Sequence, residues 1–258
     1  MANAHAEMIH FQHGPLRIST TEIWSARNVV VSGDIVRYWY CDAPPPGNAH
    51  FVTQYTIEID LTARMESLRA AMRRSTRIQI RRAEADGLQI HFWLHPDAQV
   101  LESFVCFYDR VAWKRLPGSS VARLHALEQN GMLALSSVDS SSDEPLVWHC
   151  YEIIGSRVRC WYSASILHLF KTSTERNKLG RANRYLHYRD MAAFQSAGFE
   201  VYDFGGWYSG KEDAKKLGIN RFKEDFGGRI VKRCFCDVGV TLLGKCWLML
   251  RRLRGRVI

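Results

Sequence analysis

The chain has 258 residues, of which 47% are hydrophobic and 24% are charged. This supplies enough apolar material for one large domain or two small ones, and it excludes intrinsic disorder, a collagen-like chain and a coiled coil. The 35 Lys and Arg residues exceed the 26 Asp and Glu residues, which gives a net charge of +9. Such a basic balance indicates an anionic partner: phosphate, nucleic acid or an acidic membrane surface.

The cysteines and the apolar runs exclude two further classes. The seven cysteines form no CxxC pair, and Cys234 and Cys236 are too close together for a zinc knuckle, so we expect reduced thiols and no metal site. Residues 1–16 lack the apolar block of a secretory signal, and no run reaches the roughly 18 apolar residues of a membrane span. We therefore expect a cytoplasmic protein, with peripheral contact at the inner membrane face left open.

Alternating apolar and polar residues predict a strand-rich N-terminal piece over 1–48. Within it, 27–32 and 34–40 are expected to pair as a hairpin around Ser32-Gly33-Asp34. The short run Pro44–Gly47 predicts a surface loop rather than a flexible linker.

The main domain is expected over 49–232. A strand over 51–60 is followed by helical periodicity over 61–85, which Gly87 ends. A polar loop is expected over 165–180. The remaining expected elements are strands at 88–94, 132–138, 146–154, 157–163 and 199–206, and helices at 97–115, 121–130 and 181–197. Strands and helices do not alternate regularly in this order, which predicts a mixed α/β fold.

The expected loop ends in a motif suited to a pyrophosphate. Asn177-Lys-Leu-Gly-Arg-Ala182 is close to the pattern Gln/Arg-x-x-Gly-x-Gly/Ala. Gly180 would permit close backbone approach, the amides up to Ala182 would face the anion at a helix start, and Lys178 and Arg181 would add charge. An ordinary polar helix start accounts for the same residues, so both interpretations stay open.

A more specific pattern lies downstream. Tyr202-Asp-Phe-Gly-Gly-Trp207 is followed, after a gap of ten residues, by Gly218-Ile-Asn-Arg-Phe-Lys-Glu-Asp-Phe-Gly-Gly228. With the upstream strings 56–61 and 77–87, these segments resemble the FemA/FemB/FemX-like branch of the GNAT acyltransferase superfamily. The resemblance spans residues 50–232. It implies a single-domain member with a GNAT-type fold, in which helices flank a central, largely antiparallel sheet.

The same resemblance implies acyl transfer to an amine of a sugar, or of a lipid- or nucleotide-linked precursor, in envelope or polysaccharide synthesis. Peptidoglycan members of that branch carry two such domains in tandem and use aminoacyl-tRNA. This chain has room for one domain, and with the pyrophosphate-like motif this favours acyl-CoA as co-substrate, without a tightly bound cofactor. Asn177 departs from that motif, which has Gln or Arg at this position. The basic charge and the Fem-like strings favour aminoacyl-tRNA, which stays the alternative donor.

The resemblance also assigns candidate residues. Lys223, next to Phe222, is expected to lie beside the donor and to stabilise the developing oxyanion; a solvated lysine is the alternative. Asp203 is a candidate to orient or deprotonate the amine, or instead to accept N–H bonds in the Gly-Gly turn. Tyr208 is a candidate proton donor to a leaving thiolate. His187, on a helix face, is interpreted as a packed residue.

No Ser–His–Asp or Cys–His arrangement is evident, so direct attack in a ternary complex is expected rather than a covalent enzyme intermediate. Arg77 and Arg81 are expected to contact a phosphorylated substrate, with a solvated helix face as the alternative. Trp207 is a candidate wall of an acyl or sugar pocket, although core packing also explains such a tryptophan.

The positive charge is concentrated at the C-terminus. Residues 229–258 hold eight Lys or Arg and one Asp, a net +7, which leaves +2 for the rest of the chain. Leucines and Trp247 interleave with these charges, so 233–258 is expected to be an amphipathic segment whose part 245–258 contacts an anionic membrane or a nucleic acid such as tRNA. A non-catalytic domain that docks on RNA or a membrane is the competing function.

Overall fold

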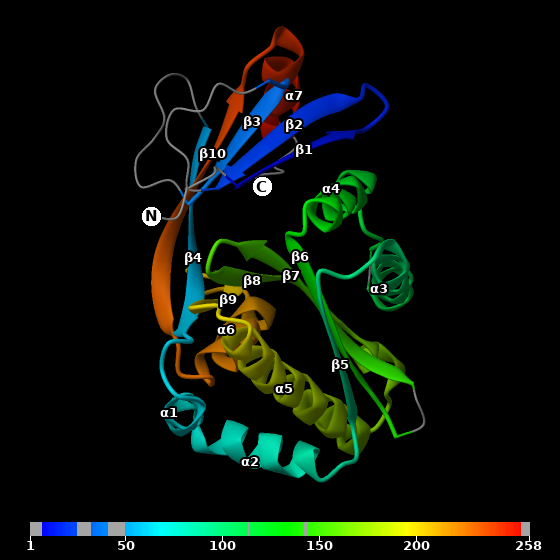
Figure 1. Cartoon of the computed structure of the whole chain (residues 1–258), viewed down its shortest axis with the longest axis vertical. Coiled ribbons are helices and arrows are strands. Elements are labelled where there is room, and N and C mark those ends of the chain that lie inside the picture. The colour runs from blue at the N-terminus through cyan, green and yellow to red at the C-terminus, as the bar shows by residue number, and fades with distance from the viewer. Residues whose placement is uncertain (1–6, 25–31, 41–49, 113, 142–143, 254–258) are drawn as a thin grey trace. The chain divides into compact units, whose positions relative to one another are not determined.

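The computed structural model describes residues 7–24, 32–40, 50–112, 114–141 and 144–253 (Figure 1). The chain forms two compact units. The first contains Met1–Gln54, Pro117–Asn130 and Lys232–Ile258, and the second contains Tyr55–Leu116 and Gly131–Val231. The predicted N-terminal piece and the predicted C-terminal segment therefore belong to the same unit.

The first unit is built on four strands. Strand β1 (Glu7–His13) pairs antiparallel with β2 (Ile18–Trp24), β2 pairs parallel with β3 (Ile35–Trp39), and β3 pairs antiparallel with the end of β10 (Arg229–Gly239). The expected hairpin strand over 27–32 lies outside the described residues except for its last residue. The strand expected over 34–40 is confirmed as β3, and its described partners are β2 and β10.

Two helices complete this unit. Helix α4 (Gly118–Gln129) contacts β1, and α7 (Leu242–Leu253) packs Leu248 against Ile18 and Ile35. In its described part, 233–253, the segment expected over 233–258 is thus the end of β10 followed by a helix. No helix in the described part of the chain is both long and apolar enough to cross a membrane.

A buried charge network joins distant segments of the first unit. The Glu22 side chain is fully buried, and its carboxylate accepts hydrogen bonds from Arg123 Nε at 2.7 Å, Trp39 Nε1 at 3.0 Å and Arg37 Nη1 at 3.3 Å. Arg37 also donates twice to the Asp237 carboxylate, at 2.7 and 2.9 Å. The network therefore ties β2, β3, β10 and α4 together through charge-assisted bonds.

We expect Arg123→Met to lower the free energy of unfolding by about 3 kcal/mol, because it removes one partner of a buried carboxylate. Urea denaturation of the parent protein, of Arg123→Met and of a control variant measures this free energy. The control is Arg73→Met, whose ion pair with Asp225 holds an arginine side chain that is 70% exposed, and whose loss is expected to cost under about 1 kcal/mol. Equal small losses for the two variants would contradict the prediction.

All ten described strands belong to one sheet, and the second unit contains the part with the order β4-β9-β8-β7-β6-β5. These strands are β4 (His50–Asp60, of which Tyr55 onward lies in this unit), β5 (Gln89–Leu94), β6 (Leu133–Asp139), β7 (Pro145–Ile154), β8 (Arg157–Ser165) and β9 (Val201–Trp207). Neighbouring strands pair antiparallel except β8 and β9, which pair parallel. The expected mixed α/β fold with a largely antiparallel sheet is confirmed.

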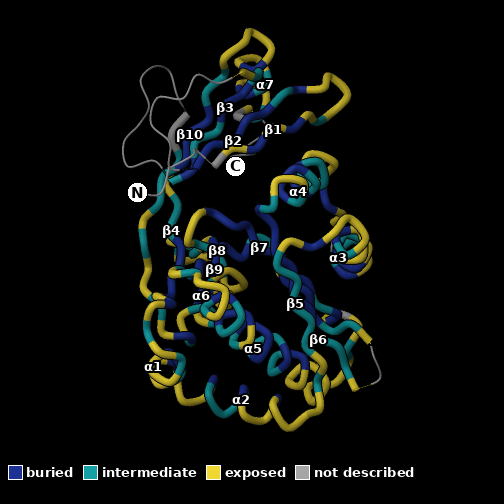
Figure 2. The backbone as a smooth tube through the Cα atoms, in the orientation of Figure 1, coloured by how far each residue is buried: buried dark blue, intermediate teal, exposed yellow. Residues whose placement is uncertain are grey.

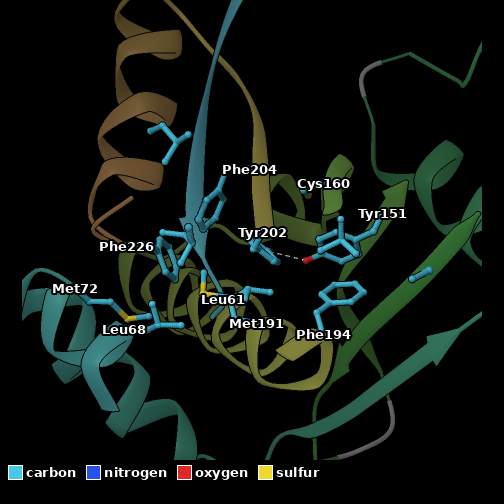
Figure 3. Close-up of a cluster of buried hydrophobic side chains, with 14 of the residues drawn as sticks. Leu61, Leu68, Met72, Tyr151, Cys160, Met191, Phe194, Tyr202, Phe204 and Phe226 are labelled. Atoms are coloured by element: carbon cyan, nitrogen blue, oxygen red, sulfur yellow. Dashed lines mark hydrogen bonds between the residues drawn. The ribbon is translucent and has the colours of Figure 1, made fainter. Parts of the chain in front are cut away.

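Helices cover both faces of this sheet. Trp148 of β7 packs on Phe104 and Phe107 of α3 (Ala98–Val111). Tyr151, three positions further along β7, packs on Phe194 of α5 (Ser173–Ser196). Side chains separated by an odd number of positions on a strand point to opposite faces, so α3 and α5 lie on opposite faces. Figure 3 shows the core around Tyr151, Phe194 and Tyr202, and Figure 2 shows that buried residues follow the strands.

The prediction of a single helix over 61–85 is wrong. The structure has two helices, α1 (Met65–Ala71) and α2 (Arg74–Glu84), separated by extended backbone at Met72 and Arg73. Arg73 N donates to Asp225 O at 2.9 Å instead of to its own helix. Apolar periodicity cannot reveal this break, because the competing carbonyl lies far away in the sequence.

The start expected for the long helix at 181 is also wrong. Helix α5 begins at Ser173, where Thr172 and Glu175 form a capping box: Thr172 Oγ1 accepts from Glu175 N at 3.2 Å, and Glu175 Oε2 accepts from Thr172 N at 3.1 Å. The spacing Thr-x-x-Glu is a start signal visible in the sequence, and it outweighs the glycine at position 180. The remaining helices of this unit are the 3₁₀ turn η1 (Ile166–Leu169) and α6 (Ala214–Glu224).

Candidate active site

A cavity of about 920 Å³ opens where the two parallel strands part. The recorded pairing of β8 with β9 ends at Arg159 opposite Asp203. Beyond that point, Cys160–Ser165 of β8 supply most of one wall, and Phe204 and Gly206 of β9 line the cavity as well. The cavity therefore lies at the carboxyl ends of the only parallel pair among the described strands of this unit, a usual place for a ligand in an α/β sheet.

Gly205 and Asp203 fix the point of divergence. Gly205 has φ +71°, and a Cβ there would lie 2.7 Å from the carbonyl oxygen of Cys160. The Asp203 carboxylate is fully buried and accepts from Gly205 N at 2.7 Å and from the hydroxyl of Thr56. Thr56 Oγ1 also lies 2.9 Å from Gly205 O. The Asp-Phe-Gly-Gly string thus forms an irregular stretch within β9, opposite the register shift between Thr56 and Glu58 of β4, and only glycine fits at position 205.

We expect Gly205→Ala to cost at least about 2 kcal/mol of stability, from the left-handed backbone and the contact with Cys160. Gly206→Ala is the matched control, since a Cβ there meets nothing within 4 Å, and it is expected to cost less than about 1 kcal/mol. Thermal and urea unfolding compare the two. Equal stability of both alanine variants would show that the close approach at Gly205 is incorrect.

The positively charged side chains that line the cavity come from α6 and from α5. Helix α6 contributes Lys215, Phe222 and Lys223, and the segment around the start of α5 contributes Phe170 and Arg176. Three cationic side chains and no carboxylate are among the described residues that line the cavity. A cavity with this lining favours an anionic ligand that also carries an apolar part.

Lys223 is held inside this cavity. Its Nζ donates to Gly206 O at 2.7 Å, which ties α6 to the end of β9. Burial lowers the pKa of Lys223 from its usual value, whereas nearby Cys160 and Asp203 act in the opposite direction. Phe222 and Lys223 both line the cavity, and the expectation that Lys223 lies beside the donor stays a prediction.

Cys160 lies on the cavity wall but is unsuited to be a nucleophile. Burial raises the pKa of its thiol to about 12, so the thiol is neutral at physiological pH. Because the thiolate is the reactive form, the geometry offers no activated cysteine in the cavity.

A chain of buried polar side chains lies behind the cavity wall. His187 Nδ1 is 2.6 Å from the Tyr202 hydroxyl, which is 2.8 Å from the Tyr151 hydroxyl (Figure 3). Tyr151 donates to Asp190 Oδ2 at 2.5 Å, and His149 Nδ1 lies 2.8 Å from the same oxygen. His187 also lines the cavity, so the chain connects the ligand space to a buried carboxylate.

His149, His187 and Asp190 are close enough to be considered as metal ligands. The contacts argue against that use. The two imidazole rings stack at 4.0 Å, so their in-plane lone pairs do not converge, and the 2.8 Å distance from His149 Nδ1 to Asp190 Oδ2 is a hydrogen-bond length. His149 Nε2 is also engaged, 2.9 Å from Asn183 Oδ1. The cluster is therefore a hydrogen-bonded network.

The pyrophosphate motif does not have its expected geometry. Asn177, Lys178, Gly180, Arg181 and Ala182 all lie inside α5 rather than in a loop. Their amides are used within the helix, so they cannot form the predicted cradle of backbone N–H groups. Arg181 pairs with Asp86 at 3.0 Å, and Ala182 is buried. The cradle over 177–182 is a wrong prediction; Arg176, directly before the motif, is the cation of α5 that lines the cavity.

The other predicted residues lie around the cavity without lining it. Tyr208 is held by its backbone, which exchanges two hydrogen bonds with the Asn220 side chain. Trp207 Nε1 donates to Glu224 Oε1 at 2.7 Å. Arg77 and Arg81 line a separate hollow of about 270 Å³ with two further arginines. The catalytic role of Tyr208 and the substrate contacts of Trp207, Arg77 and Arg81 stay predictions.

The buried network was not predicted from the sequence. Two signals pointed to it. Asn183, His187 and Asp190 follow the spacing i, i+4, i+7, which places three polar side chains on one face of a helix. His149 and Tyr151 are two apart on a strand and therefore share a face. Polar residues repeated on faces that are otherwise apolar indicate an internal network, although the pairing of the two faces needs the fold.

Comparison with known proteins supports the fold. No protein-family model matches the chain, and no curated protein sequence matches it. The chain is similar to the crystal structure of FemX, with a TM-score of 0.60 and 14% sequence identity over 97% of this chain and 88% of that chain. The chain has a FemX-like, GNAT-type fold. The resemblance found in the sequence motifs is thus confirmed at the level of structure.

Two further solved structures share this FemX-like fold. One is the C-terminal domain assigned to a lysylphosphatidylglycerol synthetase from Agrobacterium fabrum, with a TM-score of 0.52 and 12% identity over 95% of this chain and 87% of that chain. The other is L-PGS from Bacillus licheniformis, with a TM-score of 0.51 and 12% identity over 86% of this chain and 74% of that chain. At these identities the likeness concerns the fold.

Proposed function

We propose that the chain is an acyltransferase that moves an acyl group to an amine in the cavity between β8, β9 and α6. The observation that supports this most directly is the lining of the cavity: Lys215, Lys223 and Arg176 surround a partly apolar space without a carboxylate. An activated acyl donor combines an anionic carrier with an apolar arm, and this lining complements both. The FemX-like fold and the retained Phe222-Lys223 string support the same class of reaction.

In this proposal Lys223 lies near the acyl carbonyl. Its ammonium group, fixed by the bond to Gly206 O, stabilises negative charge as the carbonyl oxygen becomes an oxyanion. Arg176 and Lys215 bind the anionic part of the donor or acceptor. The amine attacks the acyl carbon directly, the carrier leaves with the bonding electron pair, and no acyl-enzyme forms because the Cys160 thiol is neutral.

We infer acyl-CoA as the donor and aminoacyl-tRNA as the alternative. Phe170, Ile219 and Phe222 give the cavity an apolar side, which suits an acyl chain and a pantetheine arm. Residues 177–182 form no backbone cradle, so the choice of donor rests on the cavity lining. The proposed acceptor is the amine of a sugar or of a lipid-linked precursor in envelope or polysaccharide synthesis.

The donor test uses coenzyme A and acetyl-CoA as probes, with hydroxylamine as a small amine. We expect coenzyme A to bind in calorimetry and acetyl-CoA to release thiol faster when hydroxylamine is present. Lys223→Met is expected to slow this release by about 100-fold, the usual effect of removing an oxyanion donor. Lys211→Met, an exposed lysine outside the cavity, is the control and should retain the activity.

The alternative donor gives a different result. Transfer from aminoacyl-tRNA that ribonuclease abolishes, with no binding of coenzyme A, would overturn the acyl-CoA assignment and retain the class of reaction. Absence of transfer from either donor, or full activity of Lys223→Met, would overturn the proposed function.

We also propose that α7 binds an anionic membrane surface. Its buried side carries Gly244 and Leu248, whereas Leu242, Met249 and Leu253 are 79%, 64% and 74% exposed. The spacing of the exposed residues places them on one helix face, and the exposed Lys245 adds positive charge. An apolar helix face beside basic residues is the pattern of an interfacial helix, and it would bring a lipid-linked acceptor close to the protein.

Vesicle sedimentation tests this surface. We expect the protein to sediment with phosphatidylglycerol vesicles at low salt and to be released by about 0.5 M salt, because the attraction is partly electrostatic. Met249→Glu should abolish sedimentation. Leu16→Glu changes another exposed apolar residue, 61% exposed, and should leave it intact. Equal binding of Met249→Glu and the parent protein would show that α7 is not the membrane contact.

A further inference from the structure

The buried hydrogen-bonded network that runs from His187 through Tyr202 and Tyr151 to Asp190 has no part yet in the proposed function. Its four members come from three elements: His187 and Asp190 from α5, Tyr202 from β9, and Tyr151 from β7. All four are buried, with exposed fractions of 2%, 1%, 0% and 0%. One end lines the ligand cavity at His187, and the other end is a carboxylate.

Counting protons fixes the direction of the hydrogen bonds. As a carboxylate, Asp190 only accepts, so its Oδ2 accepts hydrogen bonds from the Tyr151 hydroxyl at 2.5 Å and from Nδ1–H of His149 at 2.8 Å. With Nδ1 of His149 protonated, the 3.1 Å contact between that nitrogen and the Tyr151 hydroxyl leaves Tyr151 as the acceptor there. The 2.8 Å contact between the two tyrosines therefore has Tyr202 as donor. Tyr202 has then used its single proton, so the 2.6 Å contact with His187 requires Nδ1–H of the imidazole as donor.

This assignment determines the other nitrogen of His187. A neutral imidazole carries one proton, so with Nδ1 protonated, Nε2 keeps a free lone pair on a ring that lines the cavity. The neutral state is favoured, because burial, and then the neighbouring His149, Lys223 and Arg184, lower the pKa of His187 well below its usual value. An imidazolium in these surroundings would be unstable.

We propose that His187 Nε2 accepts the proton of the attacking amine and that Tyr202 and Tyr151 pass the charge on to Asp190. The amine nitrogen bonds to the acyl carbon and gives one proton to Nε2. The Nδ1 proton moves to the Tyr202 oxygen, the Tyr202 proton to Tyr151, and the Tyr151 proton to Asp190 Oδ2. One proton has left the amine, Asp190 has become a neutral acid, and His187 is neutral again.

The relay removes a charge conflict. A base that became a cation in the cavity would face Lys223 and the other cations. By transferring the positive charge along three hydrogen bonds, the chain neutralises a buried carboxylate instead. Asp190 Oδ1 has no hydrogen-bond partner among the described residues, so this buried carboxylate is incompletely satisfied. The reverse transfer returns the proton through His187 to the leaving group.

In this inference, which rests on the proposed function, His187 is the catalytic residue and the two tyrosines and Asp190 are positioning residues. Its structural part can be measured without any substrate. Two-dimensional ¹⁵N–¹H spectra of the intact protein at pH 7, with His187 assigned from His187→Gln, report which ring nitrogen carries the proton. We expect protonated Nδ1 and bare Nε2. A protonated Nε2, or zinc that co-purifies at one equivalent and is removed by a chelator, would overturn the relay.

The kinetic part compares Tyr202→Phe with Tyr185→Phe, using the donor that proves active. Tyr202→Phe removes the hydroxyl that follows His187 and should lower kcat by about 10- to 100-fold with KM unchanged. It should also move the acid limb of the pH–rate profile to lower pH, because protonation of His187 is then no longer stabilised by passing a proton on to Asp190. Tyr185 lies on α5, as His187 does, and its hydroxyl contacts only Arg189 among the recorded bonds. Tyr185→Phe should therefore behave like the parent protein.

The two failures are distinguishable. If the parent protein transfers acyl groups and Tyr202→Phe keeps its kcat and pH profile, the relay is wrong and the proposed function stands. If the parent protein transfers nothing from either donor, the proposed function is wrong, and the relay falls with it even where the Nδ1–H tautomer is found.

Discussion

The parting of β8 from β9 is the constraint on which the site depends. The strands pair in parallel as far as Arg159 and Asp203, and Gly205 keeps them in contact with the backbone at Cys160. Beyond that point no pairing between these two strands is recorded, and the cavity lies there. Asp203, fully buried, serves this geometry by accepting from Gly205 N and Thr56. Its observed contacts favour a structural role in this stretch of β9.

Charge is distributed asymmetrically around that opening. The lining that the structure describes carries cations and no carboxylate, whereas Asp203 of β9 and Asp190 of α5 are buried and do not line the cavity. This arrangement lets the cavity attract an anion while the carboxylates stabilise the surrounding cations and hydroxyls. The same separation occurs in the first unit, where Glu22 is enclosed by Arg37 and Arg123. In both units, acidic groups are placed inside and matched to donors.

Much of this architecture was predictable from local sequence. Alternation located the strands from β5 to β9, and the Asp-Phe-Gly-Gly and Phe-Lys strings led to the FemX-like fold and to Lys223. Predictions failed where a distant group decided the local conformation: Asp225 O breaks the helix at Arg73, and no periodicity contains that information. The misplaced start of α5 is different, because the Thr172 and Glu175 capping box was present in the sequence and was outweighed by a weak glycine motif.

The buried network shows why a site is harder to predict than the fold that carries it. His149 and Asp190 are 41 residues apart, and Tyr151 and Tyr202 are 51 apart, so their contacts exist only once β7, β9 and α5 have packed. Each residue alone has an ordinary explanation as core. Together they form one ordered chain of donors, because the carboxylate at one end admits a single direction of bonding. In the proposed relay it is this direction, rather than any single residue, that leaves Nε2 of His187 able to accept a proton.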